Sequence, residues 1–175
     1  MKKFKLTSEF IVDISGVKLF RIKALIEFGN VKAGDLGGYI EKEENLSHMG
    51  DAWVSDDARI SGNAQVFGNA QVFGDAWVFG NARVFGNARV SGDAQVFGDA
   101  RVSGDKDYAY AHGFGSCNRT TTFFRLKDGD VGVRCGCFYG TLAQFRDKVC
   151  ETHGETKKAQ EYLMLADLME IRFKN

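Results

Sequence analysis

The chain has 175 residues, with 23 basic and 23 acidic side chains and no proline. This length fits one compact unit or two small ones. The even charge balance excludes a strong pull toward nucleic acid or an anionic membrane, and no run of about 18 apolar residues marks a membrane-spanning helix. The sequence shows no basic and apolar leader and its four cysteines have no CxxC spacing, so we expect a cytoplasmic protein.

The first region, residues 1–49, has the alternating pattern of a β-hairpin. Two runs, Phe10–Ser15 and Val17–Ile26, meet at the Ser15-Gly16 turn. A glycine-rich, acidic stretch then leads into a set of repeats. Because a coiled β-structure leaves an unpaired edge at each end, we predict that residues 1–49 form an N-terminal β cap.

Residues 50–103 repeat one six-residue phrase nine times, Gly-Asp/Asn-Ala-x-Val-Phe/Ser, with Asp56 in place of one glycine. A fixed short period is the signature of a solenoid. Residues two apart on a strand point to the same side, so each hexad turns its Ala and Val inward and the residue between them outward. The Gly-Asp/Asn pair tolerates the positive φ of a tight turn. The pattern therefore predicts a parallel β coil.

The phrase Val-x-Gly-Asp/Asn-Ala-x resembles the hexapeptide repeat of left-handed parallel β-helices. In that class three hexads make one triangular coil, which implies about three coils over residues 50–104. The class contains acyltransferases, anhydrase-like enzymes and purely structural proteins. The resemblance therefore implies a mainly β fold and leaves the function open.

The last region, residues 105–175, predicts a small α+β domain of order β-β-α-α. Two strand patterns flank a turn at residues 127–130. A capping box from Thr141 to Gln144 begins a helix that Gly154 ends, and a second helix begins near Thr156.

The whole chain also resembles a group of bacteriophage and prophage proteins that carry hexads between two flanking segments. The resemblance is carried by Val17–Leu25, Gly34–Glu41, Thr122–Arg125, Cys135–Leu142 and Thr152–Gly154. It implies a phage origin, this architecture and a location in the host cytoplasm. It implies no established activity.

Catalytic and metal-binding patterns are weak in this sequence. The histidines, His48, His112 and His153, all lie outside the hexads, whereas hexapeptide acyltransferases place a catalytic histidine on a coil or an inserted loop. Cys135 and Cys137 share a strand face but lack the spacing of a zinc site. We expect no enzyme activity, no metal and no cofactor, and an acyltransferase stays the less favoured alternative.

The outward positions of the hexads carry aromatic side chains in columns, because residues 18 apart stack on one face. Exposed aromatics beside arginines have the composition of an interface core. We therefore predict a homo-oligomer, a trimer, whose interface includes Trp53, Trp77, Phe79 and Phe97. The alternative is an aromatic ladder within one chain.

A glycine-rich stretch at residues 113–122 is the best candidate for a small-ligand site. Backbone N–H groups of such a stretch form a nest for an anion, and arginine and threonine side chains add charge-assisted bonds. The predicted ligand-binding residues are Gly115, Ser116, Asn118, Arg119, Thr120, Thr122, Arg125 and Arg134. The alternative is a glycine linker that runs into an ordinary strand.

These observations favour a non-catalytic, oligomeric binding protein. The hypothesis is that it sequesters a phosphate-bearing host nucleotide of defence signalling, which needs affinity and no chemistry. The alternative is a protein-interaction or structural module that inhibits a host protein or forms part of a virion.

Overall fold

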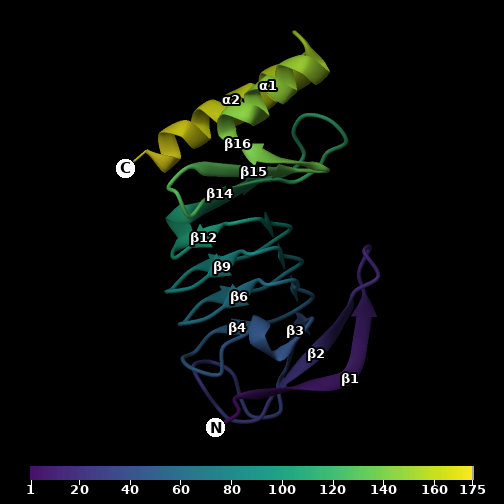
Figure 1. Cartoon of the computed structure of the whole chain (residues 1–175), viewed down its shortest axis with the longest axis vertical. Coiled ribbons are helices and arrows are strands. Elements are labelled where there is room, and N and C mark those ends of the chain that lie inside the picture. The colour runs from purple at the N-terminus through teal and green to yellow at the C-terminus, as the bar shows by residue number, and fades with distance from the viewer. Residues whose placement is uncertain (175) are drawn as a thin grey trace.

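The computed structural model describes residues 1–174, which stack in three parts along one long axis (Figure 1). A hairpin lies at the N-terminal end, a coiled β-solenoid forms the middle, and a small sheet with two helices covers the far end. The two chain termini lie at opposite ends of the molecule. None of the helices in this described part is long and apolar enough to cross a membrane.

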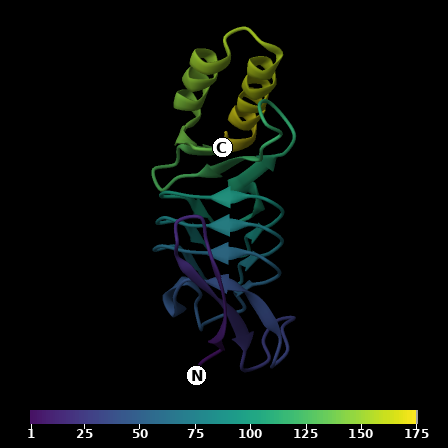
Figure 2. The same ribbon diagram turned by 90° about the vertical axis from the view of Figure 1, so that its right-hand side faces the viewer.

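The nine hexads form nine two-residue strands that stack in parallel. Each strand pairs with the one 18 residues further on, as in Trp53↔Gln71 and Val54↔Val72. The strands are β4 (Trp53–Val54), β5 (Arg59–Ile60), β6 (Gln65–Val66), β7 (Gln71–Val72), β8 (Trp77–Val78), β9 (Arg83–Val84), β10 (Arg89–Val90), β11 (Gln95–Val96) and β12 (Arg101–Val102). They form three faces, β4-β7-β10, β6-β9-β12 and β5-β8-β11. Figure 2 shows one face as stacked rungs.

The solenoid interior consists of the repeated alanines and β-branched residues. Every Ala, Val and Ile at these two positions of the nine hexads is at most 1% exposed. The glycines at the corners have φ between 62° and 72°, and Asp56 takes the same conformation with φ 55°. The predicted inward and outward positions and the corner turns are therefore confirmed.

The solenoid has about four turns, where the repeats alone predicted three. The extra turn comes from residues before the first hexad: β3 (Leu36–Ile40) pairs in parallel with β5, and Leu46 bridges Val66. Ile40 and Leu46 are buried in line with the hexad valines. The hexad pattern missed this turn because only its inward residues follow the spacing, while the 3₁₀ helix η1 (Glu43–Asn45) interrupts the phrase.

The N-terminal hairpin consists of β1 (Phe4–Val12) and β2 (Lys18–Ala24), and β2 continues into β3. The tip of the hairpin stands beside the solenoid (Figures 1 and 2). At the other end of the hairpin, the Lys3 ammonium donates to the carbonyls of Gly50 (3.2 Å) and Ala52 (2.7 Å). Lys3 thereby satisfies carbonyl groups at the start of the coil.

The C-terminal part is a four-stranded antiparallel sheet covered by two helices. Its strands are β13 (Tyr108–Ala111), β14 (Thr121–Arg125), β15 (Val131–Cys135) and β16 (Phe138–Thr141), after the short η2 (Asp105–Asp107). The helices are α1 (Leu142–His153) and α2 (Lys157–Phe173), and the predicted capping box opens α1. The sequence predicted two of the four strands. Phe123, Phe145 and Tyr162 belong to the core between sheet and helices.

Candidate functional site

The predicted anion cradle lies in the loop between β13 and β14, where it already holds a carboxylate of the same chain. The N–H of Gly115 donates to Oε2 of Glu161 on α2 at 2.7 Å. The N–H of Ser116 donates to the hydroxyl of Tyr162 at 2.9 Å. A Cβ at Gly115 would overlap the Tyr162 ring. The nest prediction is therefore corrected: the anion in this loop is Glu161, which fastens the loop to α2.

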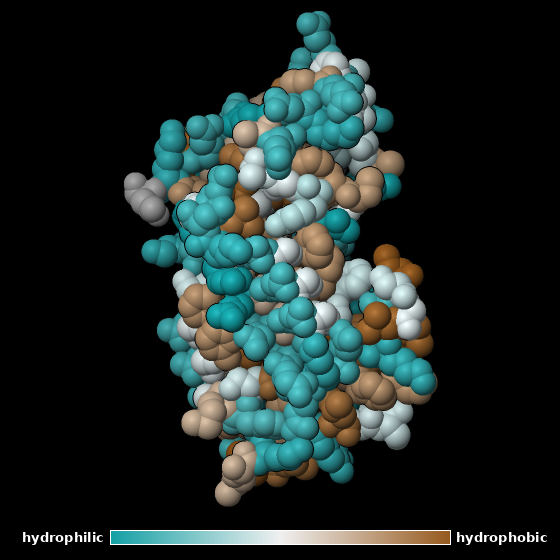
Figure 3. Space-filling view, in the orientation of Figure 1, coloured by the Kyte–Doolittle hydropathy of each residue, from teal (hydrophilic) through white to brown (hydrophobic). Residues whose placement is uncertain are grey.

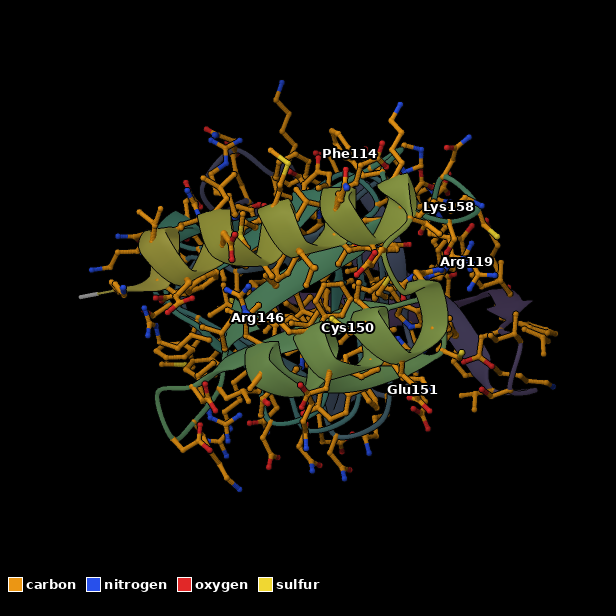
Figure 4. All side chains as sticks on the ribbon, turned by 90° about the horizontal axis from the view of Figure 1, so that it is seen from above. Phe114, Arg119, Arg146, Cys150, Glu151 and Lys158 are labelled. Atoms are coloured by element: carbon orange, nitrogen blue, oxygen red, sulfur yellow. The ribbon has the colours of Figure 1, made fainter. Side chains whose placement is uncertain are left out.

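The three arginines predicted for this site have separate roles. Arg119 is exposed beside the end of the helix pair where α1 ends and α2 begins (Figure 4). Arg125 donates to the carbonyl of Phe173 at 2.9 Å. The guanidinium of Arg134 lies over the ring of Phe97, with 5.3 Å between its Cζ and the ring centroid. The structure does not bring these three cations together into one pocket.

The other predicted ligand residues are also engaged or separate. Thr120 Oγ1 lies 2.9 Å from His112 Nδ1, and the buried Thr122 accepts the N–H of Gln95 at 2.9 Å. Asn118 is exposed with a φ of 45°. Thr122 thus links the C-terminal sheet to the last solenoid coil, which is a structural role.

The predicted oligomer interface is covered by its own chain. Trp53 is 4% exposed and meets the ring of Phe28 edge-on, so it is not available to a partner. Trp77, Phe79 and Phe97 form a ladder, with centroid distances of 4.7 Å and 4.4 Å. The ladder continues from Phe97 into Tyr139 of β16, also at 4.7 Å. The intramolecular ladder, the alternative in the sequence analysis, is the arrangement observed.

His48 is the histidine closest to a hollow, of about 620 Å³, between η1 and Phe67. Its Nδ1 accepts the N–H of Lys3 at 3.2 Å, so Nε2 carries the hydrogen and donates to Oε1 of Glu43 at 2.7 Å. Hydrogen bonds from Lys2 and then from His48 lower the pKa of the Glu43 carboxyl. Both nitrogens of His48 are engaged, so the ring has no free nitrogen to serve as a general base in this state.

Among residues 1–174, no three His, Cys, Asp or Glu side chains gather closely enough to hold a metal ion. Cys135, the half-buried cysteine, accepts the hydroxyl of Thr121, and the other three cysteines are exposed. All four are free thiols.

Two adjoining hollows form a groove along the β4-β7-β10 face. One, of about 420 Å³, extends from the loop at residues 29–31 to Phe73 and Arg89. The other, of about 560 Å³, continues from Phe73 and Arg89 to Tyr110 and Arg172. Each volume lies in the range of small-molecule sites. We call this combined surface the Phe73–Arg89 groove.

The centre of the groove is a cation stacked on an aromatic ring. The Cζ of Arg89 lies 5.5 Å from the ring centroid of Phe73. The backbone of Arg89 is fixed on both sides, because its N–H donates to Asp105 (2.9 Å) and its carbonyl accepts the hydroxyl of Tyr108 (2.6 Å). The guanidinium itself has no hydrogen bond or ion pair within the described chain. A charged side chain with a fixed backbone and free donors is suited to bind a ligand.

The sequence analysis placed Gln71 and Arg89 in one outward column but missed the groove. Its walls come from the 29–31 loop and from Tyr110 and Arg172, which are distant in the sequence. The only sequence signal was the 18-residue spacing of the column. It locates the floor of the groove and says nothing about its walls.

A second exposed surface lies on the outer side of α2. Met164, Leu168 and Ile171 follow each other at helical spacing and are 71%, 54% and 69% exposed. Phe114 lies on the flank of α2 that faces away from α1 (Figure 4). Arg146 lies between the two helices, where it pairs with Asp167 and Glu170 of α2. We call the three exposed residues the α2 stripe.

These features define a β-solenoid protein with a helix-covered sheet at its C-terminal end. The family model described as "YdcK Beta solenoid repeat" matches residues 58–74, 76–92, 82–95 and 94–105 of this chain. A comparison with curated proteins finds no match. The family match covers the repeats alone, so it supports a repeat β-helix and assigns no activity.

Proposed function

We propose that this protein is a non-catalytic, oligomeric binding module whose recognition surface is the Phe73–Arg89 groove. The observation that carries the proposal is the unpaired guanidinium of Arg89, stacked on Phe73 between two hollows. In this proposal the coil is left-handed, the N-terminal hairpin is a cap and the protein is of phage type, after the classes that the sequence resembles.

The solenoid makes the groove rigid before any ligand binds. Its floor residues lie on strands whose N–H groups bond to the next coil, as Gln71 does to Ala88 and Phe73 to Val90. A preformed site loses little conformational entropy on binding. Binding by mass action needs such rigidity and needs no nucleophile or base.

Sequestration of a phosphate-bearing nucleotide, favoured by the sequence, is less well supported at residues 115–122. The Gly115 N–H is occupied by Glu161, and Arg119, Arg125 and Arg134 lie apart. A nucleotide would instead find cationic donors in the groove at Arg89 and Arg172.

A thermal-shift screen tests the proposal, with nucleotides, sugars and peptides as ligands. A ligand at a hundredfold excess over its Kd stabilises the folded state by about 2.7 kcal/mol, or roughly 5–10 °C for a chain of this length. Phe73→Ala should abolish the shift, while Phe67→Ala, at the same hexad position on another face, should keep it. The proposal is contradicted if no ligand gives a shift or if a bound ligand is chemically turned over.

The α2 stripe favours a second candidate function, a protein-interaction module. Three large apolar side chains in one exposed row are typical of a helix that contacts a partner. Leu168→Glu should abolish capture of a host protein under this alternative and leave ligand shifts unchanged. Loss of the ligand shift in Leu168→Glu would instead link the stripe to the groove.

A further inference from the structure

We propose that the Phe73–Arg89 groove binds a neutral, chain-like carbohydrate. This inference rests on the proposed binding function and names its ligand class. It starts from polar groups in the groove whose positions are fixed by one hydrogen bond and whose second bonding capacity is free within residues 1–174. Free donors and free acceptors occur side by side.

The free acceptors are an amide oxygen and a carboxylate oxygen. The Gln71 Nε2 donates to the carbonyl of Asp51 at 2.9 Å, which leaves its Oε1 without a partner. The Asp56 Oδ2 accepts the N–H of Gly74 at 3.0 Å, which leaves its Oδ1 without a partner. Each side chain is held by its bonded atom, so each free oxygen has a defined direction.

The free donors lie on the next coil. Asn69 donates its Nδ2 to Oδ1 of Asn87 at 3.2 Å, and the Nδ2 of Asn87 has no acceptor. The guanidinium of Arg89 adds further N–H groups. A ligand that fills this groove must therefore accept from Asn87 and Arg89 and donate to Gln71 and Asp56.

Hydroxyl groups meet this requirement because each one donates and accepts. A phosphate only accepts when it is ionised, and it would face the carboxylates of Asp51, Asp56 and Asp105 in the same groove. Like charges at close range repel. Two arginines against three carboxylates favour a neutral polyhydroxylated ligand over a nucleotide.

The aromatic rings and the length of the groove indicate a chain of sugar units. Phe73 and Tyr110 offer apolar faces to the C–H side of a sugar ring. The groove crosses three coils, and stacked strands are about 4.8 Å apart. A peptide could not add to this face as a strand, because backbone groups of the face, such as the Gln71 and Phe73 N–H groups, already bond to the next coil.

Calorimetry with cello-, chito- and malto-oligosaccharides, from monosaccharide to hexasaccharide, tests the proposal at low and high salt. We expect affinity to rise with chain length for at least one series and to change little with salt, since no ion pair forms. Arg89→Ala and Phe73→Ala should each weaken binding about tenfold or more. The matched controls are Arg83→Ala and Phe67→Ala, which lie on the β6-β9-β12 side and should bind normally.

Three outcomes overturn the carbohydrate proposal. Sugar binding that survives both groove variants places the site elsewhere. Nucleotide or peptide binding that Arg89→Ala abolishes, without sugar binding, rejects the carbohydrate and leaves the proposed binding function intact. No binding of sugars, nucleotides or peptides rejects the inference and the proposed function together.

Discussion

The backbone N–H of Gln95, on the last strand of one solenoid face, donates to Oγ1 of Thr122 on β14 at 2.9 Å. Thr122 is fully buried. The bond satisfies a donor that has no further coil to pair with, so a side chain of the C-terminal sheet completes the ladder. This contact joins the two cores of the molecule.

Thr122→Val should therefore destabilise the protein by about 1–3 kcal/mol, because the substitution keeps the shape and leaves the Gln95 N–H without a partner. Chemical denaturation measures the loss. Thr121→Val is the matched control, since Thr121 donates only to the sulfur of Cys135. Equal losses in both variants would contradict the role of the Gln95 bond.

Val78→Asp should prevent folding. Val78 is fully buried in the middle of the solenoid, and an isolated carboxylate there would have no partner. Circular dichroism and solubility measure the outcome. Gln65→Asp, at an exposed outward position, should fold normally. A soluble Val78→Asp protein with a cooperative transition would mean that the inward residues have been misassigned.

Gly115→Ala should destabilise the C-terminal part more than Gly113→Ala. Both glycines have positive φ, 71° and 86°, so both alanines carry backbone strain. Only the Cβ at position 115 meets the Tyr162 ring, whereas nothing lies within 4 Å of position 113. Thermal denaturation compares the two variants. A smaller or equal loss at position 115 would show that the loop does not pack on α2 as observed.

The stability of the protein should rise with pH between about 8 and 10.5. Burial lowers the pKa of Lys3 from 10.5 to about 8, with the Asp51 carboxylate acting in the opposite direction. In that window the unfolded chain binds a proton that the folded chain does not, so the free energy of unfolding increases with pH. Below pH 8 both states are protonated and the cost of burying the charge is fully present.

Lys3→Met separates this effect from the titration of cysteines and tyrosines, which both proteins share. Urea denaturation at several pH values should show the rise in the wild type relative to the variant. Parallel pH profiles for the two proteins would contradict the lowered pKa.

The protein should form a homo-oligomer, with a trimer as the expected number, through the tip of the N-terminal hairpin. Phe10, Val12 and Ile14 are 44%, 55% and 93% exposed there, and brown apolar atoms gather on this projection in Figure 3. Ile14→Glu should weaken assembly in sedimentation experiments, and Ser8→Glu, exposed on the same hairpin, should not. A wild-type mass of 19.4 kDa at micromolar concentration would reject the oligomer.

The sequence by itself determined the solenoid and the helices. The inward Ala and Val positions, the corner glycines and the Thr141 capping box follow from local rules, namely two-residue alternation on strands, the steric freedom of glycine at positive φ and hydrogen bonding within one helical turn. Each of these rules acts over a few residues, so the chain alone displays them.

Only the tertiary structure decided which groups remain free to bind. The Gly115 nest looks empty in the sequence, yet Glu161, 46 residues later, fills it. The aromatic columns look exposed, yet Tyr139 covers their end and Phe28 covers Trp53. Conversely, Arg89 has no visible signal in its own hexad and becomes the centre of a groove because Tyr110 and Arg172 form its far wall. Whether a polar group is satisfied depends on contacts between distant segments, and the local pattern carries no record of those contacts.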